Sequence, residues 1–134
     1  MTEMTDRELA EIAYSMQERA YVPYSHYPVG AAILCADGTV FTGCNIENAA
    51  YGSSICAERT ALLKAVSEGH QKDWVKIAVV TSGDEPGYPC GSCRQMLYEF
   101  APTLKIIIGG KDRVLSTTTL DQLLPHGFGP SALD

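Results

Sequence analysis

Two short motifs place residues that bind metal ions and move protons at the start of two helical patterns. Cys56, Ala57 and Glu58 begin one pattern, and Cys90 and Cys93 lie at the start of another. A Cys-x-x-Cys pair spans one helical turn and can hold one ion, and a third thiolate would leave tetrahedral zinc with one open position. A carboxylate beside that position could act on the water that fills it. The two motifs therefore favour an open, catalytic zinc site.

Two other interpretations of the cysteines stay open. Cys90 and Cys93 could form a thioredoxin-like redox pair, or a closed structural zinc site could recruit Cys44 as a fourth ligand. Neither alternative gives a role to the carboxylate of Glu58. Cys35 and Cys44 lie on or beside expected strands, so we interpret them as small buried hydrophobic residues.

The motifs need a scaffold, and the chain alternates helical and strand patterns. Thr5 and Glu8 fit a capping box before the first helix, and Asp37 with Gly38 suits a tight hairpin turn. Helices are expected over 6–20, 56–68, 91–100 and 120–124, strands over 29–36, 39–43, 75–81, 105–108 and 114–116, and a long loop over 44–55. This order predicts an α/β fold, a three-layer α-β-α sandwich around a mixed sheet of about five strands.

Length, composition and charge narrow the class of protein. The 134 residues are expected to form one domain, and 46% hydrophobic with 19% charged residues is typical of a packed soluble domain. A net charge of −6 repels a polyphosphate backbone, which argues against nucleic acid as a partner. No leader pattern or long apolar run occurs, so a cytoplasmic protein without a membrane partner is expected. The histidines at 26, 70 and 126 have no ligand spacing and receive no function.

Six segments together resemble the zinc-dependent cytidine deaminases in order and spacing. They are Tyr24-Ser25, Val29-Gly-Ala-Ala32, the stretch 43–51, the stretch 56–61, the stretch 89–95 and Leu123-Leu-Pro125. A ligand-x-Glu motif followed by Pro-Cys-x-x-Cys is also a signature of base deaminases. The resemblance covers nearly the whole chain. It implies a single catalytic domain over 1–134 of the short, homotetrameric type, with one zinc ion per subunit held by Cys56, Cys90 and Cys93.

The resemblance also implies a reaction, the hydrolysis of cytidine and 2′-deoxycytidine to uridine and 2′-deoxyuridine with release of ammonia in pyrimidine salvage. Zinc-bound hydroxide would attack C4 while Glu58 shuttles protons. The backbone N–H of Ala57 would hold the pyrimidine carbonyl, and Asn45 and Glu47 would bind the ribose hydroxyls. Arg59 would hydrogen-bond the cysteine sulfurs and withdraw part of the charge of the three thiolates.

Three aromatic residues are expected at the substrate. Tyr27 stands where family members commonly carry a phenylalanine against the nucleoside, and Tyr51 and Phe128 are expected to reach a neighbouring subunit. Each active site would then be composed at a subunit interface. The alternative functions are deamination of another small aminopyrimidine or of an aminonucleoside antibiotic of the blasticidin type, and a non-catalytic zinc module. The expected sugar-binding residues Asn45 and Glu47 argue against the other deaminase activities, and the carboxylate of Glu58 argues against the non-catalytic module.

Overall fold

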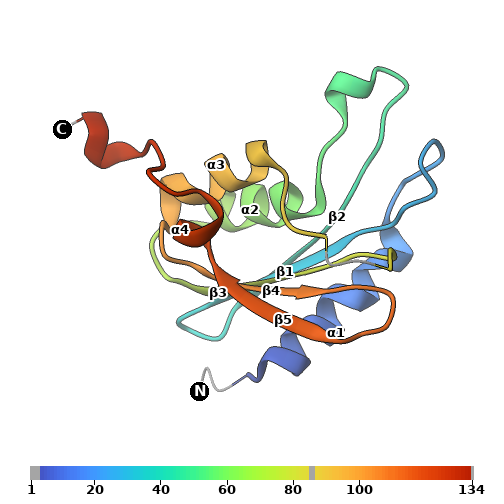
Figure 1. The fold of residues 1–134 in the computed structure, drawn as a ribbon, viewed down its shortest axis with the longest axis horizontal. Coiled ribbons are helices and arrows are strands. Elements are labelled where there is room, and N and C mark those ends of the chain that lie inside the picture. Colours follow the sequence, from blue (N-terminus) through green and yellow to red (C-terminus); the bar gives the residue numbers. More distant parts are fainter. Residues whose placement is uncertain (1–3, 85–86, 134) are drawn as a thin grey trace.

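A mixed five-stranded sheet forms the centre of the computed structural model, which describes residues 4–84 and 87–133 (Figure 1). Its strands lie in the order β2-β1-β3-β4-β5. Only β3 and β4 run parallel, and the other neighbouring pairs are antiparallel. The bounds are β1 (Gly30–Cys35), β2 (Val40–Cys44), β3 (Trp74–Val80), β4 (Lys105–Gly109) and β5 (Leu115–Thr119).

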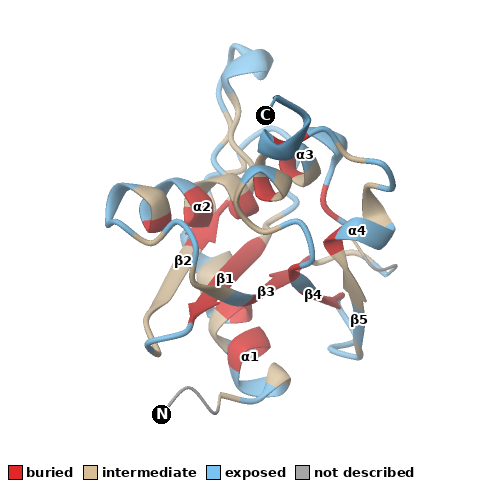
Figure 2. Ribbon diagram, turned by 90° about the vertical axis from the view of Figure 1, so that its left-hand side faces the viewer, coloured by how far each residue is buried: buried red, intermediate tan, exposed pale blue. Residues whose placement is uncertain are grey.

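Helices cover both faces of this sheet. The α-helices are α1 (Asp6–Met16), α2 (Ala57–Ser67), α3 (Gly91–Phe100) and α4 (Leu120–Leu123), with short 3₁₀ turns at Gln17–Arg19, Tyr51–Ser53 and Pro130–Leu133. The α1 helix packs on one face, and α2, α3 and α4 lie on the other (Figure 1). Figure 2 shows that burial is concentrated in the central strands and on the helix sides that face them. The predicted three-layer sandwich with five strands is confirmed.

Three local differences from the sequence prediction have physical causes. The first α-helix starts at the predicted capping box of Thr5 and Glu8, but it ends at Met16 and tightens into a 3₁₀ turn, as helix ends often do. The β5 strand extends to Thr119 because β4 supplies a five-residue antiparallel ladder for it. Within the predicted loop 44–55, single bridges join Ile46 to Tyr21 and to Ile55.

The strand register brings the ends of two strands together at one edge of the sheet. Gly30, the first residue of β1, pairs with Cys44 at the end of β2 and with Val80 at the end of β3. The chain continues from these two ends to α2 and α3 respectively. Both helices therefore begin above the same sheet edge.

Within the described part of the chain, none of the helices has the length and apolar character needed to cross a membrane.

Candidate active site

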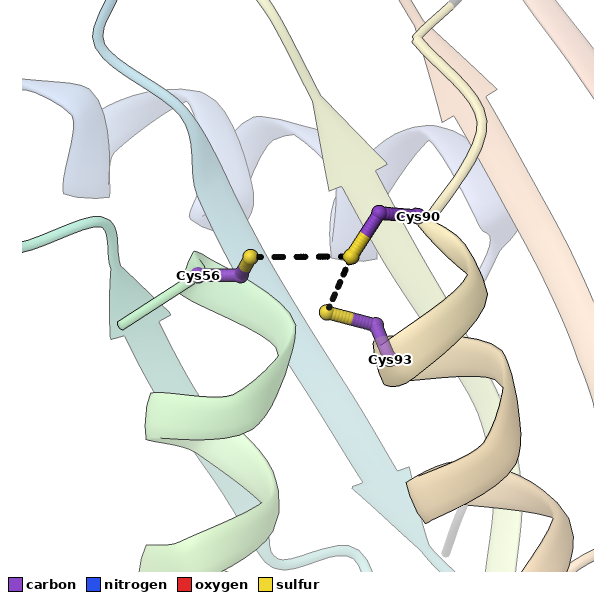
Figure 3. A group of neighbouring side chains, drawn as sticks. All are labelled: Cys56, Cys90 and Cys93. Carbon is purple, nitrogen blue, oxygen red and sulfur yellow. Dashed lines mark hydrogen bonds between the residues drawn. The ribbon is translucent and has the colours of Figure 1, made fainter. Parts of the chain in front are cut away.

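Three cysteine sulfurs meet at the N-termini of α2 and α3 (Figure 3). Cys56 is the N-cap of α2, Cys90 is the N-cap of α3, and Cys93 lies in the first turn of α3. The Cys56 and Cys90 Sγ atoms are 3.9 Å apart, and those of Cys90 and Cys93 are 3.5 Å apart. Sulfurs about 2.3 Å from one tetrahedral ion would be roughly 3.8 Å apart, so the cluster fits a single zinc ion.

The cluster favours the thiolate form of Cys56, whereas the hydrogen bond between Cys56 and Cys93 raises the pKa of Cys93. Hydrogen bonding with Cys93, then with Arg59 and Cys90, lowers the pKa of Cys56 to about 5 against the opposing effect of burial. Arg59 Nη2 donates to Cys56 Sγ at 3.6 Å. The N-terminus of α2 adds a partial positive charge at the same sulfur. A metal ion would therefore meet a ligand that is already ionised near neutral pH.

Glu58 occupies the first turn of α2 beside the sulfur cluster. The residue is 5% exposed, which is unusual for a glutamate. Burial raises the pKa of Glu58 to about 7, and the negative charge of Cys56 adds to the rise. A carboxyl group with a pKa near 7 can both accept and donate a proton at neutral pH, as a general acid and base must.

A cleft of about 320 Å³ joins the sulfur cluster and Glu58 to the surface. Of the predicted site residues, Tyr27, Asn45 and Ala57 border it together with Glu58, so the structure brings these groups together. The described residues that line it are Tyr27, Val29, Asn45, Cys56, Ala57, Glu58, Val79, Thr81, Gly87, Tyr88 and Cys90.

Several cleft residues were missed by sequence reasoning. Tyr88 lies two residues before Cys90, and its position next to the Pro-Cys motif was the available signal. Thr81 follows Val79 by two residues, so strand alternation directs both to the cleft face of the sheet. Thr81 is 3% exposed, and its hydroxyl has no partner among the described residues.

Asn45 and Glu47 hold the segment that forms one wall of the cleft. Asn45 Oδ1 accepts from the N–H of Val29 at 2.9 Å, and its Nδ2 donates to the carbonyl of Tyr27 at 2.9 Å. Glu47 Oε1 accepts from the N–H groups of Tyr24 at 3.0 Å and Ser25 at 3.1 Å. Hydrogen bonds from Ser25 lower the pKa of Glu47, which keeps it ionised. Both side chains are therefore fixed in place, and each retains polar capacity beyond these bonds.

Arg94 is a further residue that sequence reasoning missed. Its Nε donates to the carbonyl of Pro89 at 2.7 Å, and its Nη1 donates to the carbonyl of Leu123 at 2.8 Å. Pro89 directly precedes Cys90. The guanidinium therefore fixes the backbone next to one sulfur of the cluster to the end of α4.

The other predicted residues lie outside this cleft. Glu47 and Tyr51 line a separate groove with Tyr24, and the 72% exposed ring of Tyr51 meets the Tyr24 ring edge-on. Phe128 is 58% exposed near the C-terminus. Cys44 is buried and is not part of the sulfur cluster, so the described residues give no support to a closed four-cysteine site.

A three-layer α-β-α domain with three sulfurs around one metal position, and a buried carboxyl group beside them, defines a metal-dependent hydrolytic enzyme. Comparison with known families makes this class specific. Residues 3–109 match the family model "Cytidine and deoxycytidylate deaminase zinc-binding region". The chain therefore belongs to the cytidine and deoxycytidylate deaminase family, and zinc is its metal.

Individual proteins agree with this assignment. A cytidine deaminase of Halalkalibacterium halodurans is 49% identical over 92% of this chain and 94% of its own length. A cytidine deaminase of Sporosarcina psychrophila is 46% identical over 87% of this chain and 86% of its own length. The crystal structure of cytidine deaminase from Burkholderia pseudomallei superposes with a TM-score of 0.90 at 44% identity, covering 93% of this chain and 100% of that chain.

Proposed function

We propose that the chain is a zinc-dependent cytidine deaminase, which hydrolyses cytidine and 2′-deoxycytidine to uridine and 2′-deoxyuridine and releases ammonia. One observation carries this proposal: the buried carboxyl group of Glu58 lies in the same cleft as the three-sulfur cluster. A non-catalytic zinc module would gain nothing from burying a carboxylate there, because burial opposes its charge. The cytidine deaminase relatives from two bacteria support the same activity.

The proposed reaction assigns the zinc ligands to Cys56, Cys90 and Cys93 and the proton transfers to Glu58. When bound, zinc supplies the Lewis acidity that lowers the pKa of a coordinated water. Glu58 takes a proton from the attacking water and delivers it to N3 of the cytosine ring. The water oxygen bonds to C4, and Glu58 then moves the remaining proton of this oxygen to the amine, which leaves as the C4–N bond breaks, so that water and cytidine become uridine and ammonia. The pKa of about 7 suits Glu58 to both steps.

Substrate choice follows from other groups in the cleft and from Glu47, which lines a neighbouring groove that shares Asn45 and Cys56 with the cleft. The N–H of Ala57 holds the pyrimidine carbonyl, and the ring of Tyr27 packs against the nucleoside. Asn45 and Glu47 bind the ribose hydroxyls, since a carboxylate accepts strongly from an O–H donor. Because Glu47 is anionic, it also disfavours a 5′-phosphate and therefore selects a neutral nucleoside.

The exposed aromatic residues support a proposed homotetramer, with one zinc ion per subunit and active sites composed at subunit interfaces. Tyr51 and Phe128 expose large apolar rings to solvent in the single chain. Gln95 Nε2 donates to the carbonyl of Phe128 at 2.7 Å and so fixes the backbone of Phe128 to α3. Light scattering should report four subunits for the wild type and fewer for Tyr51→Ala, and a monomeric wild type would contradict the proposed homotetramer.

We also propose that the enzyme acts in the cytoplasm, in pyrimidine salvage.

The activity is tested by following ammonia release from cytidine, cytosine and dCMP. The wild type should act on cytidine and far less on the other two, and Glu58→Ala should abolish turnover while zinc is retained. Glu68→Ala is the matched control, because this glutamate caps the other end of α2 and is exposed. Activity that survives in Glu58→Ala, or a zinc-loaded wild type that acts on no nucleoside, would overturn the assignment.

A further inference from the structure

A second cluster of metal-binding side chains lies at the opposite edge of the sheet from the active site. Cys35 ends β1 and pairs with Trp74 at the start of β3, whereas the active site lies above the other ends of these strands. His70 and Asp73 come from the connection between α2 and β3. One ligand atom each from Cys35, His70 and Asp73 all lie within 4.8 Å of one another.

We propose that Cys35, His70 and Asp73 form a second metal site, separate from the catalytic one, for a divalent transition-metal ion of the zinc type. Thiolate, imidazole and carboxylate are together the ligand set that zinc and cobalt accept. Calcium and magnesium prefer oxygen ligands alone and would be disfavoured. The fourth position would fall to water or to Asp37.

The side chains of the cluster already face one another. His70 Nδ1 and Asp73 Oδ2 are 2.8 Å apart, close enough for one ion to bind both atoms in place of this hydrogen bond. His70 Nε2 lies 3.8 Å from Asp37 Oδ2, so a second carboxylate faces the same ring. Asp73 Oδ1 is buried and has no partner among the described residues. A buried carboxylate oxygen without a donor is costly, and a cation would remove that cost.

Backbone contacts hold the two contributing segments together. The N–H of Ala36 donates to the carbonyl of Asp73 at 2.8 Å and joins the β1–β2 hairpin to the α2–β3 connection. The N–H of His70 donates to the carbonyl of Ala65 at 2.9 Å, and Trp74 Nε1 donates to the carbonyl of His70 at 2.9 Å. These hydrogen bonds tie the connection that carries His70 and Asp73 to α2, to the hairpin and to β3, which limits the ordering that binding must impose.

Access and protonation set conditions for binding. Cys35 is fully buried, and burial, followed by the charges of Asp73 and Asp37, raises its pKa to about 12. An ion must therefore displace the thiol proton, which weakens the site relative to the catalytic one. A surface groove of about 350 Å³ shares His70 and Asp73 with the cluster and offers a path for the ion. The groove is lined by Gly69, His70, Gln71, Lys72 and Asp73.

Titration with Co²⁺ tests the second site without relying on deaminase activity. Protein carrying one zinc per chain is titrated while total zinc and cobalt are measured by mass spectrometry and thiolate-to-cobalt charge transfer is followed by absorbance. We expect the wild type to keep its zinc and bind one further equivalent of Co²⁺ with a thiolate band. Cys35→Ser should lose the band, and His70→Ala should lose the second equivalent.

Matched controls separate this site from the catalytic one and from surface binding. His126→Ala removes an exposed histidine and should behave as the wild type. Circular dichroism and zinc content establish that Cys35→Ser and His70→Ala remain folded, and the two variants test the site independently. A wild type that binds no second equivalent, or unchanged Co²⁺ binding in both variants, would overturn the proposal.

Discussion

Gly43 of β2 lies directly against the backbone of the helix that carries Glu58. A Cβ atom at Gly43 would stand 2.3 Å from the carbonyl oxygen of Ala57 and 2.6 Å from the N atom of Ala61. Both neighbours are backbone atoms, so no side chain can rotate out of the way. Ordinary contact begins at 3.4 Å, so Gly43→Ala must move α2 away from β2 by about 1 Å.

This displacement should affect catalysis more than folding. Overpacking of this kind costs about 1–3 kcal/mol of unfolding free energy, which a domain of this size can tolerate. A shift of about 1 Å in a catalytic group, however, can lower turnover by about 100-fold. Because Glu58 lies one residue after Ala57, it must move with the start of α2. We therefore expect Gly43→Ala to fold and to lose kcat by about two orders of magnitude.

The assay compares kcat, zinc content and urea unfolding for Gly43→Ala and a matched glycine variant. Gly52→Ala is suitable because a Cβ atom at Gly52 would meet nothing within 4 Å. It should keep the kcat and stability of the wild type. If Gly43→Ala retained kcat within a few-fold at normal stability, the reasoning that close packing of α2 sets the position of Glu58 would be refuted.

Three further substitutions test other parts of the molecule. Burial opposes the ionisation of Asp6, but hydrogen bonds from Lys105 and Lys76 outweigh it and lower its pKa below 3.8. The stability that the ionised Asp6 adds is present above pH 3.8 and is lost as the pH falls through its lowered pKa. Asp6→Asn should therefore lower the free energy of unfolding, measured with urea, by about 1 kcal/mol at pH 7 and by little in strong acid. Arg59→Ala should keep some zinc but lose turnover, and unchanged turnover at normal zinc content would exclude its proposed role. Arg94→Ala should speed zinc release to a chelator several-fold, and an unchanged release rate would show that its backbone contacts do not steady the cluster.

Local patterns in the sequence predicted the elements because their causes are local. The capping box of Thr5 and Glu8 marks the start of α1, and the sequence spacing of Cys90 and Cys93 places both at the start of α3. The N-termini of α2 and α3 converge because β2 and β3 end at the same edge of the sheet, where both strands pair antiparallel with the start of β1. The expected order of elements only suggested this convergence.

Contacts between distant segments could not be predicted in the same way. Arg94 bonds the carbonyl of Leu123, 29 residues away, and no periodicity encodes a side chain's backbone partner. His70 has no ligand spacing to another histidine, yet folding places it beside Cys35 and Asp73. Burial alone was foreseen for Cys35, and the structure confirms it. Which polar groups share a buried site depends on tertiary packing rather than on sequence spacing.

The central claim is that zinc at the three-sulfur cluster and Glu58 together deaminate cytidine. The most direct measurement is ammonia release from cytidine by zinc-free protein, by the same protein after one equivalent of zinc is restored, and by Glu58→Gln at equal zinc content. We expect no turnover without zinc, recovery with one equivalent, and a loss of at least about 100-fold in Glu58→Gln. Wild-type rates in Glu58→Gln, or turnover that does not depend on zinc, would contradict the account.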